Sequence, residues 1–361
     1  MFGTFARLAK LEFAPPEYLS LPTAGIDVSA SGIKVITLKE ALNGLELVTY
    51  AEERLAPGVI QNSEVSDRAG VVKTLKAIVK QHKVQYANIT LPESRGYLFE
   101  ATVPGRTPQE WRVAVEEHLD EYVPLPVQEV AYDIVPLKEQ GDGMHVVGIG
   151  YARRVIDTTL ENFADAGITV RAIESEVFAL PRALLQHGDT DTVLIIDIGK
   201  TTTKLLIVTA RIPRFATTLD IGGHALTLAV QKHFGVTEEE AKRVKAEKGL
   251  VVGEENEEYL TAMLSTVSVI RDEIVRRLDY WQTRGGTLAA HSAVTRAVLV
   301  GGNATLRGLP EYLGAALKIP VELGDVFRNF APRGNWLPPL DYTESLAYGT
   351  AIGLALREYV P

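Results

Sequence analysis

The sequence predicts an α/β protein built from two related lobes, with a smaller α+β module inserted into the first lobe. The chain of 361 residues is longer than a single hydrophobic core usually supports. A pattern of strand, acidic turn and return strand occurs twice, around Asp27 and around Asp197. Residues 92–170 lie between the two copies and carry helix and strand patterns without such a turn, which indicates an insertion.

The first lobe follows an N-terminal segment, residues 1–22. Its apolar side chains fit one side of a short helix, and a loosely docked tail is favoured over an anchor for a membrane or a partner. From 24 to 38 the pattern is strand, polar turn, strand, and a further strand at 45–51 follows the hairpin signal Asn43-Gly44. Helical spacing of apolar residues predicts a helix over 65–83, before a strand at 86–91.

The insertion has its own start and stop signals. Thr107 and Glu110 form a capping box with Pro108 at the first helical position, so a helix is expected to begin there and to end at Pro124. Strands at 129–137 and 146–152 are joined by a glycine-rich turn, and a helix over 155–166 follows.

The second lobe begins with a strand at 193–198 and continues with strands at 204–208 and 214–220. A helical stretch starts at Gly222-Gly223, and Thr237 with Glu240 forms a second capping box. A long helix through 263–281, a strand at 297–300, a helix over 309–317 and a last helix over 345–358 complete the chain.

Composition excludes several classes of function. The net charge of −9 argues against nucleic acid as a partner, because binding to a phosphate backbone needs clustered positive charge. The absence of cysteine removes disulfides, thiolate metal sites and cysteine nucleophiles. No apolar run approaches the roughly 20 residues of a membrane span, so a cytoplasmic protein is expected.

The repeated motif is the central candidate for function. In each copy an aspartate stands at the end of an apolar strand, small and hydroxyl residues form the turn, and a lysine begins the return strand. Such a turn places backbone N–H groups and hydroxyls where phosphate oxygens accept hydrogen bonds. The candidate residues are Asp27, Ser29, Ala30, Ser31 and Lys34 in the first copy, and Asp197, Gly199, Thr201, Thr202, Thr203 and Lys204 in the second.

Asp27 and Asp197 are also the candidates for holding Mg²⁺, through water, because magnesium gives up its hydration shell reluctantly. A single copy of the motif would be interpreted as an ordinary hairpin with an acidic turn. Two copies in the same register, each at the start of a lobe, favour paired phosphate loops.

Other residues are weaker candidates. Gly301, Gly302 and Asn303 follow a strand and permit close approach to a nucleotide, and Gly222 with Gly223 could approach a phosphate, with plain turns as the alternative. Among Lys242, Arg243 and Lys245, a solvated basic face is favoured over contact with a ribose or phosphate. Glu174 is the candidate for positioning a hydrolytic water, with an exposed acid near a strand end as the alternative.

These motifs resemble the actin-like ATPases and, within them, the PilM family of type IV pilus assembly proteins, relatives of FtsA. The resemblance to PilM rests on YVPLP at 122–126, IGGHALT at 221–227, EEAKRVK at 239–245 and LPEYL at 309–313. It implies an actin-like fold with two duplicated ribonuclease-H-like lobes and an inserted 1C subdomain of the SHS2 type. In that scheme the adenosine motif spans 298–313, which adds Leu306 to the site.

The resemblance also implies domain boundaries. The tail is 1–22, and the core of lobe 1 is 23–91, completed by 171–190 and 341–361. The inserted subdomain is 92–170. The core of lobe 2 is 191–221 with 297–340, and its helical 2B subdomain is 222–296.

What the resemblance implies for function is a scaffold that binds ATP with Mg²⁺ between its lobes. Its expected partners are the cytoplasmic N-terminal peptide of a PilN-like membrane protein and other inner-membrane assembly proteins of the pilus. The expected location is cytoplasmic, peripheral to the inner membrane through these partners. Self-association and ATP hydrolysis are left open, and a weak ATPase is compatible with Ser29, which stands where the family usually has glycine.

Two alternatives remain at this point. One is an FtsA-like protein of cell division that forms filaments, and the other is a small-molecule kinase of the same superfamily. The kinase would need a catalytic base in addition to the aspartates of the phosphate loops, and the sequence offers no evident one.

Overall fold

The computed structural model describes residues 21–41, 44–61, 63–253, 256–283, 292–330 and 337–360. Most of the predicted tail and Asn43 of the predicted hairpin lie outside these residues. None of the helices in the described ranges has both the length and the apolar character needed to cross a membrane. The chain divides into two compact units, described separately: unit 1 takes 1–91, 157–187 and 325–361, and unit 2 takes 92–156 and 188–324.

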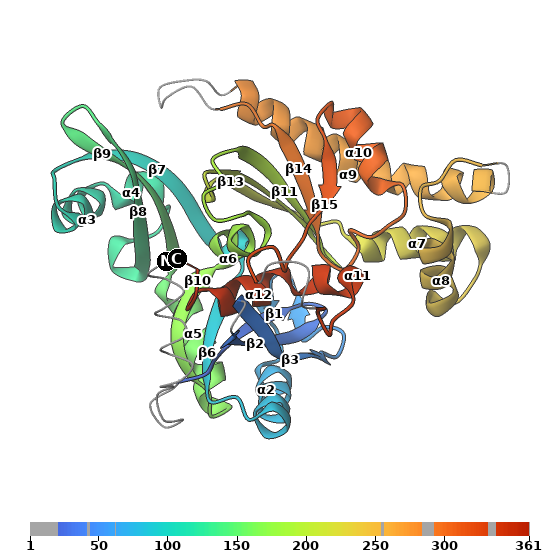
Figure 1. The fold of residues 1–361 in the computed structure, drawn as a ribbon, viewed down its shortest axis with the longest axis horizontal. Coiled ribbons are helices and arrows are strands. Elements are labelled where there is room, and N and C mark those ends of the chain that lie inside the picture. The colour runs from blue at the N-terminus through green and yellow to red at the C-terminus, as the bar shows by residue number, and fades with distance from the viewer. Residues whose placement is uncertain are drawn as a thin grey trace. The chain divides into compact units, whose positions relative to one another are not determined.

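Unit 1 is built on a five-stranded sheet with the order β10-β6-β1-β2-β3 (Figure 1). Strands β1, β2 and β3 form an antiparallel meander, whereas β6 runs parallel to β1 and β10 parallel to β6. Pairing of Ala41 with Gly44 confirms the predicted hairpin. The strands are β1 (Thr23–Ser29), β2 (Gly32–Ala41), β3 (Gly44–Arg54), β6 (Tyr86–Leu91) and β10 (Thr169–Ser175), beside a small ribbon of β4 (Ile60–Gln61) and β5 (Glu64–Val65).

Helix α2 (Arg68–His82) contributes Leu75 and Ile78 to the core of unit 1, where they belong to the same apolar cluster as Ile26 of β1. The prediction that this helix begins at 65 is wrong. Its first turn is fixed by Asp67, whose carboxylate accepts a hydrogen bond from the N–H of Gly70 at 3.0 Å. An aspartate at this position satisfies a backbone donor that the helix itself cannot pair, so the helix begins after it.

Two other helices of unit 1, α6 (Glu176–Leu184) and α12 (Gly349–Leu356), cross at very short range. A Cβ atom on Gly353 would lie 1.9 Å from the carbonyl oxygen of Ala179, so only glycine fits at this crossing. The small residues near the C-terminus therefore serve close helix packing. The remaining helical segments here are α5 (Arg153–Asp165), which begins in unit 2, α11 (Tyr342–Ser345) and η5 (Leu346–Tyr348).

Unit 2 contains a second five-stranded sheet, with the order β13-β12-β11-β14-β15. Its first three strands again form an antiparallel meander, and the other two again run parallel to the first. Both sheets therefore have the same strand order and the same directions, as expected of a duplicated lobe. The strands are β11 (Thr192–Ile198), β12 (Thr203–Thr209), β13 (Ile212–Leu219), β14 (Arg296–Val300) and β15 (Val321–Leu323).

The inserted module forms a three-stranded antiparallel sheet with the order β7-β9-β8, and belongs to unit 2. The predicted capping box is confirmed: Thr107 accepts from the N–H of Glu110, and the Glu110 carboxylate accepts from the N–H of Thr107. The helix predicted to run to Pro124 is interrupted at His118 and forms two helices. The elements are η2 (Glu93–Arg95), β7 (Gly96–Pro104), α3 (Pro108–Glu117), α4 (Leu119–Tyr122), η3 (Val127–Glu129), β8 (Val130–Gln140) and β9 (Gly143–Ala152).

The described residues of unit 2 form four more α-helices. Helix α8 begins with the predicted capping box of Thr237 and Glu240. Helix α9 buries the side chains of Met263, Ile274 and Trp281, which confirms the long helix predicted from their spacing. The helices are α7 (Gly223–Phe234), α8 (Glu238–Lys248), α9 (Glu257–Thr283) and α10 (Leu309–Leu317).

Candidate nucleotide-binding site

The first phosphate loop, residues 27–34 of unit 1, joins β1 to β2. Asp27 and Lys34 are directly paired across the two strands, and both side chains are buried. The hydroxyls of Ser29 and Ser31 lie 2.9 Å apart, and the Lys34 ammonium donates to the Ser31 hydroxyl at 3.0 Å. Glu52 of β3 pairs with the same ammonium at 3.4 Å. The loop thus gathers hydroxyls and a cation at one turn, the groups that a phosphate accepts hydrogen bonds from.

The second phosphate loop, residues 197–204 of unit 2, has the same arrangement. Asp197 is paired with Lys204 across β11 and β12, and the ammonium lies 3.9 Å from the carboxylate. The N–H of Gly199 donates to the carbonyl of Thr202 at 2.9 Å, which closes the turn. Thr203 is buried and its hydroxyl donates to the carbonyl of Ile221, so this hydroxyl holds the loop. Lys200 and Thr201 are exposed at the turn, with Thr202 half-buried beside them.

Helix α7 starts directly against the second phosphate loop. The carbonyl of Gly199 accepts hydrogen bonds from the N–H of Gly223 and from the side-chain amide of Asn303, both at 3.0 Å. The carbonyl of Lys200 accepts from the N–H of His224 at 2.8 Å. These first N–H groups of α7 therefore hold the loop in this structure. Gly222 and Gly223, predicted to approach a phosphate, lie buried at this contact.

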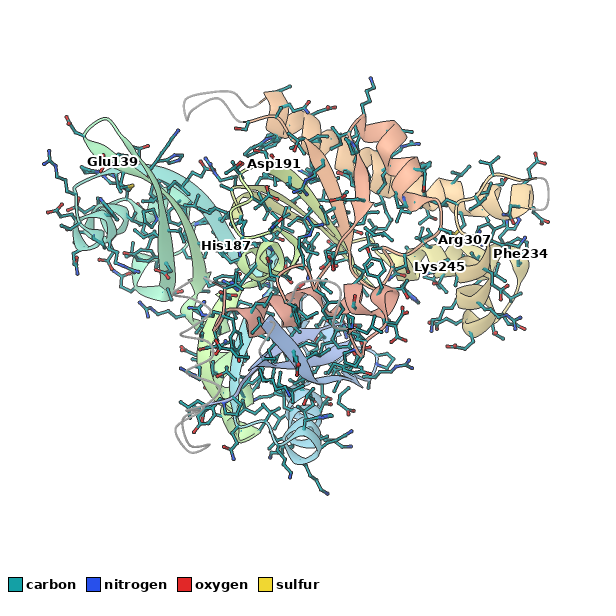
Figure 2. All side chains as sticks on the ribbon, viewed as in Figure 1. Glu139, His187, Asp191, Phe234, Lys245 and Arg307 are labelled. Carbon is teal, nitrogen blue, oxygen red and sulfur yellow. The ribbon has the colours of Figure 1, made fainter. Side chains whose placement is uncertain are left out.

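Lys245 reaches this cluster from helix α8 (Figure 2). Its ammonium donates to the side-chain oxygen of Asn303 at 2.9 Å and to the carbonyl of Gly223 at 3.2 Å. Burial, with a smaller contribution from repulsion by Lys242, lowers the pKa of Lys245 to about 8. Removal from water disfavours the charged form of a lysine, and neither of its partners is an anion. The prediction that Lys245 lies on a solvated basic face is therefore wrong. Lys242, by contrast, is exposed and pairs with Glu238.

The segment after β14 lies against Asp197. Gly301 has a φ of +96°, and a Cβ there would lie 2.3 Å from the Asp197 carboxylate oxygen, so glycine is required both for the turn and for the approach. The N–H of Asn303 donates to the carbonyl of Ile198 at 3.1 Å. Gly302 is exposed, while Leu306, the fourth candidate of this segment, is buried.

The predicted residues of unit 2 are thus brought together by four separate segments: the second phosphate loop, the start of α7, helix α8 with Lys245, and the turn after β14. The first phosphate loop belongs to unit 1 and forms its own cluster. The amide of Asn303 is the central linking group, since it bonds to both Gly199 and Lys245. Neither capping patterns nor local spacing marked this link, because Lys245 and Asn303 are 58 positions apart.

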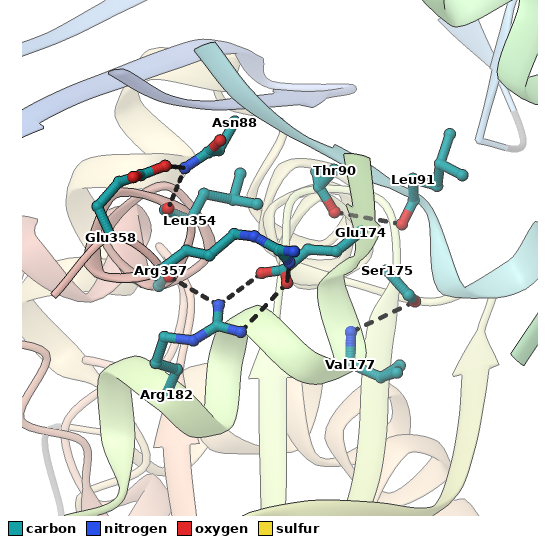
Figure 3. A network of polar contacts seen from close by, with 11 residues as sticks. Asn88, Thr90, Leu91, Glu174, Ser175, Val177, Arg182, Leu354, Arg357 and Glu358 are labelled. Atoms are coloured by element: carbon teal, nitrogen blue, oxygen red, sulfur yellow. Dashed lines mark hydrogen bonds and ion pairs between the residues drawn. The ribbon is translucent and has the colours of Figure 1, made fainter. Parts of the chain in front are cut away.

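Glu174, the predicted water-positioning residue, has a different environment. Figure 3 shows its carboxylate between Arg182 of α6 and Arg357, and both of its oxygens accept hydrogen bonds. Arg182 contacts it at 2.5 and 3.1 Å and also donates to the carbonyl of Gly353 at 3.0 Å, while Arg357 contacts it at 2.6 Å. The side chain is 9% exposed. The alternative of an exposed acid is wrong. The geometry indicates that this carboxylate has a structural role and joins β10, α6 and α12.

Among the residues that the structure describes, there is no group of three or more histidine, aspartate or glutamate side chains arranged to hold a metal ion. Asp27 and Asp197 each stand beside a lysine instead. Such a pair suits an ion that arrives with its own phosphate and water ligands, as Mg²⁺ does with a nucleotide.

The two sheets and the phosphate loops define an actin-like ATPase fold. Similar solved structures include EutJ from Carboxydothermus hydrogenoformans, with a TM-score of 0.56 and 14% identity over 98% of this chain and 98% of that one. MreB5 of Spiroplasma citri, in complex with ADP, has a TM-score of 0.57 and 14% identity over 95% and 97%.

The PilM-PilN type IV pilus biogenesis complex contains a more similar chain, with a TM-score of 0.77 and 22% identity. The alignment covers 94% of this chain and 99% of that one. The model of the family described as type IV pilus assembly protein PilM matches residues 25–359. The chain therefore belongs to the PilM family of type IV pilus assembly proteins.

Proposed function

We propose that this protein binds ATP with Mg²⁺ through its two phosphate loops, and that the nucleotide state controls its grip on a membrane-protein partner. The observation that carries the proposal is the repeated pairing of Asp27 with Lys34 and of Asp197 with Lys204 at the same position in two sheets of identical order. An ordinary hairpin does not require the same acid and base at the same register in both copies.

In unit 2 the proposed phosphate ligands are Lys204, the hydroxyls of Thr201 and Thr202 and the backbone of the loop. Lys245 is a second cation, held without an anionic partner and with its pKa lowered to about 8. A phosphate oxygen or a ribose hydroxyl would give it a better acceptor than the carbonyl and amide that it contacts now. MreB5, a protein of similar fold, was solved bound to ADP, which supports nucleotide binding by this fold.

The turn at Gly301 to Asn303 and the neighbouring Leu306 form the proposed adenosine side of the site. A flat backbone at glycine allows the base and sugar to lie close to the chain. Asp27 and Asp197 would hold the magnesium through water, while the phosphates supply its direct oxygen ligands. Glu174 is not assigned to hydrolysis, since both of its oxygens are taken by arginines.

The proposed partner is the cytoplasmic N-terminal peptide of a PilN-like membrane protein. This follows from membership of the PilM family and is supported by the similarity to a chain from a PilM-PilN complex. The inserted module, with its own apolar core around Val115 and Val146, is the proposed gripping element. The protein would then act as a scaffold at the cytoplasmic face of the inner membrane, held there through its partners.

Titration with a fluorescent ATP analogue, with and without Mg²⁺, tests the nucleotide part. Lys204→Met should weaken binding by about ten- to a hundredfold, since a hydrogen bond to a charged group contributes about 1.5–3 kcal/mol. Lys39→Met is the matched control, because Lys39 lies on β2 in an exposed pair with Glu46 at 3.1 Å. Equal affinity of the wild type and Lys204→Met, or no binding to the wild type, would refute the assignment.

The partner part is tested with a labelled synthetic peptide that copies the first residues of the PilN-like protein from the same genome. Fluorescence anisotropy should detect binding, with an affinity that changes when Mg-ATP is added. An anisotropy that stays flat in both conditions would contradict the partner assignment. Equal affinities in both conditions would contradict the control by nucleotide.

A further inference from the structure

The inserted module touches the sheet of unit 2 through a buried polar cluster of Glu100, His145 and Arg214. Glu100 lies on β7, His145 on β9 and Arg214 on β13, the edge strand of the five-stranded sheet. Their side chains are 11%, 1% and 17% exposed. We call these three residues the latch.

The latch has the geometry of a strong, directional contact. The guanidinium of Arg214 donates from Nε to Oε1 and from Nη2 to Oε2 of Glu100, each at 2.5 Å. Two parallel hydrogen bonds between charged groups fix orientation as well as distance. A buried pair of this kind resists separation, because parting leaves an uncompensated charge out of water.

His145 holds the carboxylate from the other side. Its Nε2 lies 3.1 Å from Oε2 of Glu100, and since a carboxylate can only accept, the histidine donates there. Burial is the main cause that lowers the pKa of His145. Its Nδ1 is buried without a hydrogen-bond partner. This is consistent with a neutral ring that carries its proton on Nε2. The Glu100 side chain is thereby fixed from β9 of the insert and from β13 of the five-stranded sheet.

The same edge strand is tied to the second phosphate loop. Thr218 of β13 is the direct register partner of Lys204, the lysine of that loop. The hydroxyl of Thr218 also donates to the carboxylate of Glu93, in the η2 turn that leads into the insert. Four positions earlier, Arg214 lies at the irregularity where the pairing of β12 with β13 shifts between Ile207 and Val208. Bulges of this kind re-aim a side chain, here toward the insert.

We infer that β13 is a coupling element that transmits the occupancy of the second phosphate loop to the inserted module through the latch. The inference rests on the proposed function, in which Lys204 contacts a phosphate and the insert grips a partner. When Lys204 turns from Asp197 to a phosphate, we expect the paired residue Thr218 and the strand that carries Arg214 to adjust with it. The rigid pairing with Glu100 passes this adjustment to β7 and β9.

Hydrogen–deuterium exchange of the full chain, with and without saturating Mg-ATP, measures the coupling. In the wild type the exchange rates of β7 and β9 should change by about fivefold or more on adding nucleotide, the usual size of coupling between sites. In Glu100→Gln and in Arg214→Met this difference should disappear, although titration with the fluorescent analogue still shows saturation. The double variant with Glu100→Arg and Arg214→Glu should restore part of it.

Arg112→Met is the matched control, since Arg112 also forms an ion pair within the insert, with Asp133, but an exposed one. It should leave the nucleotide-dependent difference intact. If the latch serves stability alone, Glu100→Gln will raise exchange equally with and without Mg-ATP, and the inference is overturned. It is also overturned if wild-type protein saturated with the fluorescent analogue shows no change in the insert. Absence of nucleotide binding would instead refute the proposed function.

Discussion

Replacing Lys245 by methionine should stabilise the protein without nucleotide and weaken its affinity for ATP. The two effects have opposite signs because the buried ammonium is costly when no anion is present and useful when a phosphate arrives. Methionine keeps most of the volume and the apolar stem of lysine but removes the charge and the hydrogen-bond donors of the ammonium.

The magnitude follows from the pKa of Lys245, which is lowered from 10.5 to about 8. A shift of one unit corresponds to about 1.36 kcal/mol, so the charged form costs about 3 kcal/mol at neutral pH. Methionine relieves this cost but leaves the side-chain oxygen of Asn303 and the carbonyl of Gly223 without their donor. Each loss costs about 1 kcal/mol. We therefore expect a net gain in the free energy of unfolding of about 1 kcal/mol.

Affinity for ATP should fall by about ten- to a hundredfold in the same variant, the value of one charge-assisted hydrogen bond. Urea unfolding at 25 °C and titration with a fluorescent ATP analogue give the two quantities. Lys242→Met is the matched control on the same helix, because Lys242 is exposed and pairs with Glu238 and Glu239. Surface pairs contribute about 0–1 kcal/mol, so both measurements should change little.

The pH dependence gives an independent check. The folded protein holds the Lys245 proton less tightly than the unfolded chain, so the unfolded chain binds more protons between about pH 8 and pH 10.5. Wild-type stability should therefore gain from this group as the pH rises through that window, and the advantage of Lys245→Met should shrink toward pH 10. A constant advantage across the window, or unchanged ATP affinity in the variant, would refute the reasoning.

Four further substitutions test the packing and the site. Gly353→Ala should destabilise the protein by more than about 3 kcal/mol, because its Cβ would meet the Ala179 carbonyl at 1.9 Å. Gly314→Ala on α10, with no neighbour closer than 3.6 Å, should stabilise it by about 0.5–1 kcal/mol. Urea unfolding measures both changes in the free energy of unfolding. Gly301→Ala should abolish binding of the ATP analogue or prevent folding, as judged by circular dichroism; normal binding would contradict the close approach to the second loop. Glu174→Gln should lower the free energy of unfolding by about 3 kcal/mol, since it leaves buried arginine charge unpaired, whereas an unaltered stability with lost ATP turnover would restore its catalytic assignment.

Much of the fold could be predicted because its signals are local. The phosphate loops combine an apolar strand, hydroxyl residues and a lysine within eight positions, and the pairing of Asp197 with Lys204 lies within one hairpin. Capping boxes such as Thr107 with Glu110 act within one turn and were likewise readable. The helix start at Arg68 was missed because the apolar spacing extends past the cap, while Asp67 decides where the helix begins.

Long-range polar contacts could not be predicted, since nothing in the local pattern marks them. Arg214 and Glu100 are 114 positions apart. Each is a charged residue within a strand, and the local sequence would be the same if its side chain were exposed. The local sequence makes Glu174 a candidate for catalysis, yet one of its partners, Arg357, lies 183 positions away. His145, which is buried and bonded to Glu100, lies 45 positions away from it.

The way the chain enters and leaves the inserted module has an evolutionary consequence. Gly96, at the start of β7, and Tyr151, near the end of β9, are direct neighbours across two paired strands. The module thus begins and ends at one place, within the crossover that links the adjacent parallel strands β6 and β10. A short bridge could replace it without changing the order of that sheet. The crossover is therefore a point where an ancestral two-lobed protein could acquire, exchange or lose such a module while both five-stranded sheets stayed the same.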